Sequence, residues 1–410
     1  MSGNPAASPI RPLQLRTPQE ARIELERIGV DPAGIARMLP KLEHHALLLQ
    51  QLRPPAANIL KQEMLALGGD AAVARGTVSC SVAATDVLLM GTRRQLRSLA
   101  GKLDNQPFGL KGIGARLLEL LERLQLQPEV WQTSRRKISL QRPLVMGILN
   151  VTPDSFSDGG RYNDLTCAID RAHQLVEEGA DLLDIGGEST RPGAPLITEE
   201  EELRRVLPVV EALADAIAIP ISVDTWKSQV AAAVLAAGAE IINDISGLTF
   251  DPAMAAVCAQ QRAGVVLMHT RGTPQTMQQQ TGYVDLLGEL SAALTAAAET
   301  ALAAGIGPQQ IVLDPGIGFG KDSEGNLEIL RRLQELTSLG YPLLVGTSRK
   351  AFIGKLLGRE EPLARLHGTS ATTALAVAAG AKILRVHDVQ AMKDVALMAH
   401  AISTPPTRNR

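Results

Sequence analysis

The stretch that decides the fold runs from Val145 to Gly160 and reads Val-Met-Gly-Ile-Leu-Asn-Val-Thr-Pro-Asp-Ser-Phe-Ser-Asp-Gly-Gly. Its first residues form an apolar run that is typical of a buried strand. The run ends at Asn150, and a polar loop with Pro153, two Asp residues and a Gly pair follows. A strand, a polar loop and then an amphipathic helix predict the first βα unit of a repeated series.

Seven further apolar runs follow this one, and helical segments separate them. The eight runs are Leu144–Asn150, Leu182–Gly187, Ile221–Thr225, Ile241–Ser246, Val265–His269, Ile311–Gly316, Leu343–Ser348 and Ile383–Asp388. Continuous Val, Ile and Leu suit strands that are buried on both faces. Eight βα units over roughly 260 residues predict a closed (β/α)8 TIM barrel at 143–402. An open doubly wound sheet is the alternative, but no Gly-x-Gly-x-x-Gly follows the first strand.

Every run ends in polar or Gly residues, and the carboxyl ends of barrel strands converge on one mouth where barrel active sites lie. We therefore expect a shared ligand site. Asp224, Asn243 and Asp314 follow the third, fourth and sixth strands. A flat heterocycle edge with two parallel N–H donors would satisfy such carboxylates. The alternative is that each side chain bonds to neighbouring backbone.

Cationic side chains follow the seventh and eighth strands. They are Arg349, Lys350 and Arg385, with His387 beside them. Arg and His suit phosphate oxygens, so this group predicts an anion site. For Arg349 alone, a helix cap or an ion pair with an acid is the preferred interpretation. No arrangement of residues indicates a covalent nucleophile or a zinc site.

The first third of the chain has a different pattern. We predict a disordered tail at 1–15, a small α+β domain at 16–126 and a linker at 127–142. Helices are expected at 18–29, 33–51, 56–67, 92–103 and 111–125, and strands at Thr77–Val82 and Asp86–Met90. Residues 1–139 carry a formal charge of +7 and the remainder −9. A solvated basic surface is preferred over a contact between the halves or a site for an acidic partner.

Composition limits the function further. The 410 residues carry a net charge of −2 and only ten aromatic side chains, so we expect no nucleic-acid partner. The three cysteines, Cys80, Cys167 and Cys258, show no metal or disulfide spacing, which fits a reducing cytoplasm. There is no apolar run of the ~18 residues that a membrane span needs, so we expect no membrane partner.

The motifs at the strand ends resemble those of dihydropteroate synthase, a pterin-binding enzyme of folate biosynthesis. The resemblance covers about 144–400 and begins with the signature Leu149–Gly160. The other motifs, in the same order as in the family, are Gly186–Gly193, Ser222–Thr225, Ile242–Gly247, Leu267–His269, Asp314–Lys321, Ser348–Lys350 and Arg385–Asp388. One short motif would be weak evidence, whereas eight in register are specific.

The resemblance implies a Mg²⁺-dependent transferase that joins (7,8-dihydropterin-6-yl)methyl diphosphate to p-aminobenzoate. It implies Asn150 as the ligand of Mg²⁺, and Lys350, Arg385 and Asp314 as candidate catalytic residues. The implied substrate-binding residues are Thr190, Pro192, Asp224, Asn243, Met268, Asp314, Phe319, Lys350, Arg385, Val386 and His387. It further implies a homodimer and competition by sulfonamides, which mimic p-aminobenzoate.

Two other functions remain open at this point. A methyltetrahydrofolate-binding methyltransferase barrel would share the pterin-holding Asp and Asn, but it would lack the Asn150–Gly160 loop. In a non-catalytic pterin-binding scaffold, the barrel would only support the basic N-terminal domain, which would carry the function. Residues 1–139 lie outside the resemblance, so their role is not predicted.

Overall fold

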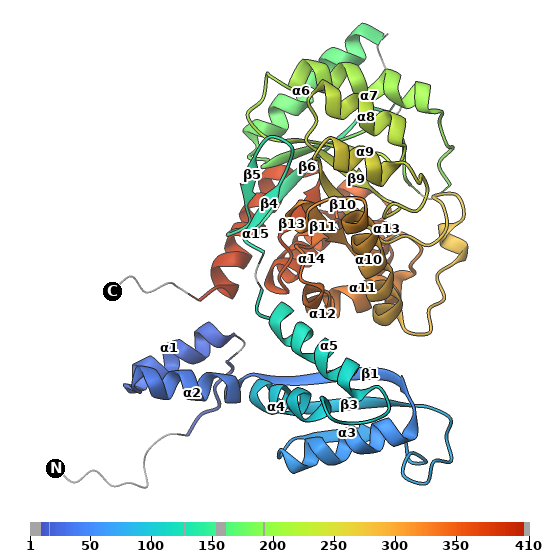
Figure 1. The fold of residues 1–410 in the computed structure, drawn as a ribbon. Helices are drawn as coiled ribbons and strands as arrows, with labels where there is room; N and C mark the ends of the chain where they lie inside the picture. Colours follow the sequence, from blue (N-terminus) through green and yellow to red (C-terminus); the bar gives the residue numbers. More distant parts are fainter. Residues whose placement is uncertain (1–9, 16, 127, 153–160, 192, 406–410) are drawn as a thin grey trace, which may run out of the picture. The chain divides into compact units, whose positions relative to one another are not determined.

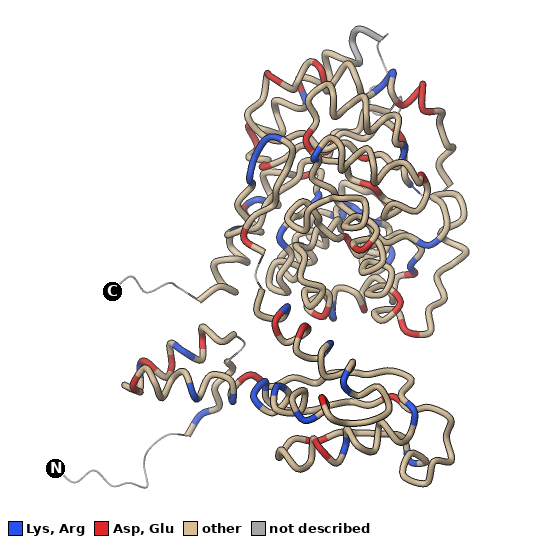
Figure 2. Tube along the Cα trace, viewed as in Figure 1, with Lys and Arg blue, Asp and Glu red and all other residues tan. Residues whose placement is uncertain are grey.

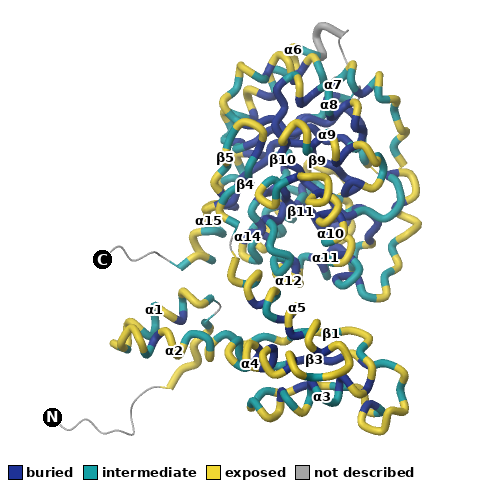
Figure 3. The backbone as a smooth tube through the Cα atoms, viewed as in Figure 1, coloured by how far each residue is buried: buried dark blue, intermediate teal, exposed yellow. Residues whose placement is uncertain are grey.

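The computed structural model describes residues 10–15, 17–126, 128–152, 161–191 and 193–405, with the backbone but not the side chains of 161–164. The chain divides into two compact units, one that ends at Gln125 and one that begins at Leu126. Each unit has its own buried core (Figure 3). The boundary therefore precedes the segment 127–142 that we predicted as a linker.

The N-terminal unit is a small α+β fold with a three-stranded antiparallel sheet in the order β1-β3-β2 (Figure 1). Leu60, Leu89 and Leu99 are fully buried between the sheet and its helices. Its elements are α1 (Pro18–Ile28), α2 (Pro32–Leu42), β1 (His44–Leu52), α3 (Pro54–Ala66), β2 (Asp70–Val73), β3 (Thr85–Thr92), α4 (Arg93–Leu103) and α5 (Leu110–Arg123).

Two predicted elements of this unit are wrong. The helix expected over 33–51 ends at Leu42, and a strand follows it, because Leu47 and Leu49 pair with Leu89 and Val87 of β3. An apolar run this short does not distinguish a helix from a strand without its pairing partner. The strand expected at Thr77–Val82 is a series of turns instead, and the strand in this part of the chain is β2.

The second unit is a closed barrel of eight parallel strands. The strand order is β11-β10-β9-β8-β7-β6-β13-β12, and a parallel bridge between Leu313 and Leu343 joins the two ends. This confirms the predicted (β/α)8 fold and excludes the open sheet. The strands are β6 (Leu144–Asn150), β7 (Leu182–Gly186), β8 (Ile221–Asp224), β9 (Ile241–Asp244), β10 (Gly264–Met268), β11 (Ile311–Asp314), β12 (Leu344–Val345) and β13 (Ile383–Val386).

Helices surround the barrel and bury one face each against the strands. The α-helices are α6 (Arg161–Glu177), α7 (Glu199–Leu213), α8 (Ser228–Ala237), α9 (Met254–Gln260), α10 (Leu286–Ala303), α11 (Ser323–Arg331), α12 (Leu333–Leu336), α13 (Ala351–Leu357), α14 (Leu366–Ala378) and α15 (Val389–Ser403). Short 3₁₀ turns lie at Met277–Gln279, Pro308–Gln310, Thr337–Leu339 and Pro362–Arg365. Among the described helices, α10 alone is long and apolar enough for a membrane span, and here it packs Leu290 and Leu294 into the barrel core.

The predicted linker contains a hairpin that belongs to the barrel. Strands β4 (Val130–Gln132) and β5 (Lys137–Ser139) pair antiparallel. Trp131 is fully buried in a cluster with the first residues of the barrel strands, such as Leu144 and Leu182, and its Nε1 donates to the Gln310 carbonyl at 2.9 Å. The hairpin therefore closes the amino-terminal end of the barrel, and the ligand site is left to the opposite end.

Candidate active site

Four strands bring a cluster of charged and polar side chains to the carboxyl end of the barrel. Arg385 lies on β13, and its Nε donates to Asp184 Oδ2 at 2.6 Å while an Nη donates to Asp224 Oδ2 at 2.8 Å. Asn243 donates to the same Asp184 oxygen at 3.1 Å. The guanidinium therefore bridges two carboxylates across the mouth, because buried charges need opposite charges or hydrogen bonds.

Asp184 is the member of this cluster that the sequence analysis missed. It is completely buried and lies inside β7, between Leu183 and Ile185. The candidate residues were those that follow the apolar runs, whereas Asp184 lies within the run Leu182–Gly187. A lone acid in an otherwise apolar strand was the available signal, because such a residue needs a buried partner.

Several buried acceptors in this cluster have no partner among the described residues. They are Oδ1 of Asp184, Oδ1 of Asp224 and the hydroxyl of Ser222. A buried polar atom without a hydrogen bond costs about 1–3 kcal/mol. The mouth is thus prepared for a ligand or water that donates hydrogen bonds to carboxylate oxygens.

Burial also sets the protonation of the mouth. It raises the pKa of Asp224 to about 7, against the opposing charge of Arg385. Burial likewise raises the pKa of Asp314 to about 6, although Oδ1 of Asp314 accepts the Gly316 N–H at 2.7 Å. This backbone bond is the alternative that the sequence left open for Asp314. Near neutral pH both carboxyls can lose their protons when donors approach them.

An aromatic and aliphatic wall faces the cluster from β10 and the loop after β11. Met268 and Phe319 pack with Ile245 and Met277 in a small buried group. The ammonium of Lys350 lies 4.3 Å from the centre of the Phe319 ring, and burial lowers the pKa of Lys350 to about 8. A flat ligand can therefore meet apolar surface on one side and polar atoms at its edge.

The loop after β11 is held by a buried lysine. Lys321 donates to the carbonyls of His269, Gly316 and Phe319 and to Nδ1 of His269 at 2.8–3.2 Å. Gly316 has φ +67°, and a Cβ there would lie 1.9 Å from the His269 carbonyl oxygen. The glycine is therefore required for the close approach that places Asp314 and Phe319 in the mouth.

Strands β12 and β13 end in a different pair of interactions. Arg349 forms a two-point ion pair with Asp388, with Nε–Oδ2 at 3.0 Å, so the preferred interpretation of Arg349 is confirmed. Ser348 Oγ accepts the His387 backbone N–H at 3.1 Å and lies 3.0 Å from His387 Nδ1. Burial lowers the pKa of His387 to about 3, so the ring is neutral and one of its two nitrogens carries a hydrogen that it can donate.

The remaining predicted residues lie at the edges of this mouth. Asn150 ends β6 and is half-buried. Thr190 is half-buried in the loop after β7, and Val386 is buried in β13. Pro192 lies outside the described residues.

A buried ion cluster lies behind the loop after β7. Lys227 bridges Glu188 at 2.6 Å and Glu202, and all three side chains are nearly inaccessible. Glu188 also accepts the Ile197 N–H at 2.9 Å, so the loop that carries Thr190 is tied to α7 and to the segment after β8. Together the fold and the mouth define a barrel enzyme for a flat, hydrogen-bonding heterocycle and an anion.

The comparisons with known proteins agree with this class. Residues 146–387 match the family of pterin binding enzymes. A dihydropteroate synthase of Synechocystis is 53% identical over 262 residues, which cover 64% of this chain and 91% of that protein. The chain therefore belongs to the pterin-binding enzymes, within the dihydropteroate synthase family.

Two further matches extend this result. The dihydropteroate synthase of Xanthomonas albilineans in complex with 7,8-dihydropteroate has a TM-score of 0.62 and 43% identity, and the match covers 68% of this chain and all of that one. A probable bifunctional folylpolyglutamate synthase/dihydropteroate synthase of Halobacterium salinarum is 41% identical over 374 residues. That match covers 90% of this chain, so it includes the N-terminal unit, but only 44% of the relative.

Proposed function

We propose that this protein is a transferase of folate biosynthesis. It condenses (7,8-dihydropterin-6-yl)methyl diphosphate with p-aminobenzoate and releases 7,8-dihydropteroate and diphosphate. The observation that carries the proposal is the Arg385 bridge between Asp184 and Asp224, which leaves a buried carboxylate oxygen of each without a partner. The X. albilineans relative, solved with 7,8-dihydropteroate, supports the same substrates.

In this proposal the pterin lies in the polar half of the mouth. Its amino and ring N–H groups donate to Asp224 and Asp314, and Asn243 offers both a donor and an acceptor. Met268 and Phe319 cover its faces, and Lys350 supplies a cation at the edge. A ring held at its edge and its faces has its reactive methylene group in one position, which is the main requirement when two bound molecules must meet.

The diphosphate lies at the rim, near β6 and β13. His387 donates through a ring N–H, Thr190 offers a hydroxyl, and Arg385 retains an Nη without a hydrogen bond to a described residue. These donors stabilise the negative charge that grows on the diphosphate as the C–O bond breaks. The electron-rich pterin spreads the positive charge left on its methylene carbon, and the amine of p-aminobenzoate then attacks that carbon.

We propose Mg²⁺ as the metal and Asn150 as its protein ligand. Among the described residues no group of three His, Cys, Asp or Glu could hold a metal. A single amide oxygen at the rim fits an ion that is held mainly by substrate phosphate and water. When bound, the ion would neutralise charge on the departing diphosphate.

The p-aminobenzoate pocket is proposed beside the pterin, with Phe319 and Lys350 in its wall; Pro192, the third residue that the resemblance implies for this pocket, lies outside the described residues. Sulfonamides should compete there. We also propose a cytoplasmic location, which the three cysteines suit because none of them forms a disulfide.

We further propose that the barrel forms a homodimer. Leu375 of α14 and Met398 and Ile402 of α15 have exposed fractions of 63%, 64% and 78%. These neighbouring helices offer an apolar face that a second copy would cover. Light scattering of the purified protein should give twice the chain mass, and Leu375→Lys with Met398→Lys should reduce it to one chain mass. A monomeric natural protein would contradict the proposal.

An activity assay tests the main proposal. The purified protein is mixed with the dihydropterin diphosphate, p-aminobenzoate and Mg²⁺, and both diphosphate and dihydropteroate are followed. A chain that begins at Leu126 is assayed in parallel, because it keeps the hairpin that carries Trp131. Product from both chains is the expected result. Pterin binding without product would instead support the methyltransferase or the scaffold function.

A further inference from the structure

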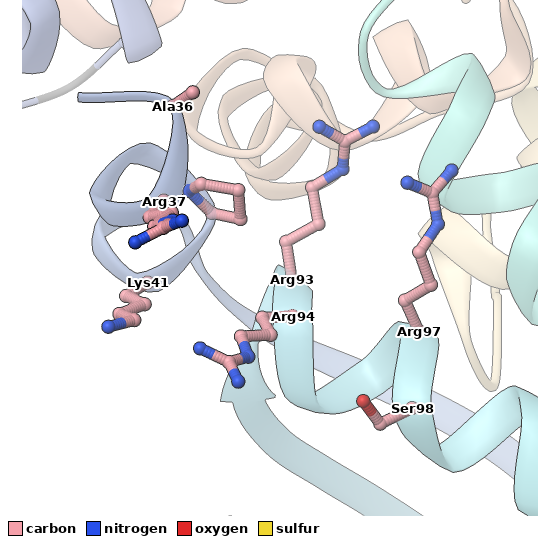
Figure 4. Close-up of a pocket in the computed structure, with 8 residues that line it drawn as sticks. Ala36, Arg37, Lys41, Arg93, Arg94, Arg97 and Ser98 are labelled. Atoms are coloured by element: carbon pink, nitrogen blue, oxygen red, sulfur yellow. The ribbon is translucent and has the colours of Figure 1, made fainter. Parts of the chain in front are cut away.

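The N-terminal unit contains an open cleft that the proposed reaction does not use. It lies between α2 and α4 and has a volume of about 570 Å³. We call it the cationic cleft, since five of its eight lining side chains are basic (Figure 4). Its lining residues are Ala36, Arg37, Pro40, Lys41, Arg93, Arg94, Arg97 and Ser98.

Helical spacing places these cations in two rows. Arg37 and Lys41 are four residues apart on α2, and Arg93 and Arg97 are four apart on α4. In Figure 4 the side chains of Arg93 and Arg97 extend from α4 in the same direction. Like charges at this spacing oppose helix formation by about 0.2–0.5 kcal/mol per pair. Two such pairs that face one cleft therefore indicate a counter-charge from outside the unit.

The unit itself supplies little of that counter-charge. Arg37, Lys41 and Arg94 form no ion pair with a described residue, while Arg93 reaches Glu43 and Arg97 reaches Glu122 only at 4.0 Å. Some arginines outside the cleft are paired more closely; Arg332, for example, lies 2.7 Å from Glu335. Figure 2 marks the Lys and Arg residues of the chain in blue and the Asp and Glu residues in red. The cleft is thus a concentration of unbalanced positive charge rather than a sample of the usual surface.

One donor in the cleft is buried and lacks a partner. Nε of the half-buried Arg93 has no hydrogen bond among the described residues. Arg93 also begins α4, whose first turn contains no acidic residue. The helix terminus adds partial positive charge at the same place. An anionic oxygen in the cleft would accept a hydrogen bond from Arg93 Nε and would also offset the partial positive charge at the start of α4.

The lining favours one class of ligand. None of the eight lining residues is aromatic, so a base has no surface on which to stack. The volume suits a small molecule rather than a long polymer. Arginine forks match tetrahedral phosphate oxygens, and two rows of cations need at least two anionic groups. We propose that the cationic cleft binds a compact ligand with two or more linked phosphoryl groups, through Arg37, Arg93, Arg94 and Arg97.

Calorimetric titration of the full chain tests this proposal. The probes are inorganic tripolyphosphate, ATP and a 20-nucleotide RNA, in moderate salt. Tripolyphosphate and ATP should bind with similar affinity, because the phosphate chain carries the contacts. In Arg37→Gln/Arg94→Gln the affinity should fall about tenfold or more, since charge-assisted hydrogen bonds are lost. The matched control Arg22→Gln/Arg116→Gln removes two exposed arginines outside the cleft and should bind within about twofold of the natural chain.

The barrel mouth also has anion donors, so its contribution must be separated. His387→Ala changes the mouth alone, and the cleft component of tripolyphosphate binding should persist in this variant. Three results would overturn the proposal: no binding component sensitive to the cleft substitutions, equal losses in the control variant, or RNA binding a hundredfold tighter than tripolyphosphate through the same residues. The last result would make the cleft a nucleic-acid surface.

Discussion

The barrel mouth and the cationic cleft both contain several positive side chains, but the two regions differ in whether these cations have acidic partners. In the mouth, Arg385 donates to Asp184 and Asp224 at 2.6 and 2.8 Å. In the cleft, Arg37 and Arg94 have no acidic partner among the described residues. The reason is burial, because a cation out of water needs a counter-charge whereas an exposed one is solvated. Paired cations suit a ligand that both donates and accepts, and unpaired ones suit an anion.

The largest expected effect comes from removing the buried cation. Arg385→Met should lower the free energy of unfolding of the barrel by about 3–5 kcal/mol, because Asp184 and Asp224 lose their counter-charge. Both tryptophans, Trp131 and Trp226, lie in the barrel unit, so urea unfolding followed by tryptophan fluorescence reports on it alone. The matched change in the cleft, Arg94→Met, should change the free energy of unfolding of the N-terminal unit, followed by circular dichroism, by less than about 0.5 kcal/mol. Equal effects would abolish the distinction between the two regions.

The second effect concerns the ligand of the mouth. Asp224→Asn places a donor against the N–H groups of the pterin, so polar groups are left unpaired at a cost of roughly 2–3 kcal/mol. Pterin binding should therefore weaken by about 30- to 100-fold. Asp251→Asn is the control, since Asp251 accepts the Ser228 and Ala253 N–H groups outside the mouth. Fluorescence titration with a pterin measures both. Unchanged affinity in Asp224→Asn would contradict the assigned role.

A smaller effect is expected at the rim. His387→Ala should weaken binding of the diphosphate-bearing pterin by about tenfold, because one donor to phosphate is lost. Binding of a pterin without diphosphate should not change. Ser348→Ala keeps the imidazole but removes its partner at 3.0 Å, so its effect should be smaller. Equal losses for both ligands in His387→Ala would mean that the histidine is structural.

The smallest expected effect is a pH dependence of pterin affinity at the mouth. Binding at the cleft should show no such dependence from its arginines, since they stay protonated. Burial raises the pKa of Asp224 to about 7, so this carboxyl is half protonated at pH 7 and ionised at pH 8. Pterin donors need the ionised form. Affinity should therefore rise about twofold from pH 7 to pH 8, and binding at pH 6 should release protons. Calorimetry in buffers of different ionisation enthalpy measures that release, and proton uptake would have the wrong sign.

Much of the barrel was predictable, because its strands are apolar runs that can be recognised from a few neighbouring residues. The run Ile221–Thr225 predicted β8 to within one residue, and its polar end predicted Asp224 at the mouth. The hairpin at 130–139 was not predictable in the same way. Its strands have three residues each, and burial of Trp131 under the barrel is what stabilises them. A pattern so short carries no periodicity of its own.

The sequence by itself determined which segments are buried strands, which face of each helix is apolar and where polar groups follow the strands, because these properties depend on a few neighbouring residues. Only the tertiary structure decided which of those groups meet. Arg385 joins Asp184 across 201 positions of the chain. Ser348 Oγ meets His387 Nδ1 across 39 positions of the chain. Such pairings exist because the barrel closes, and closure is a property of all eight strands together.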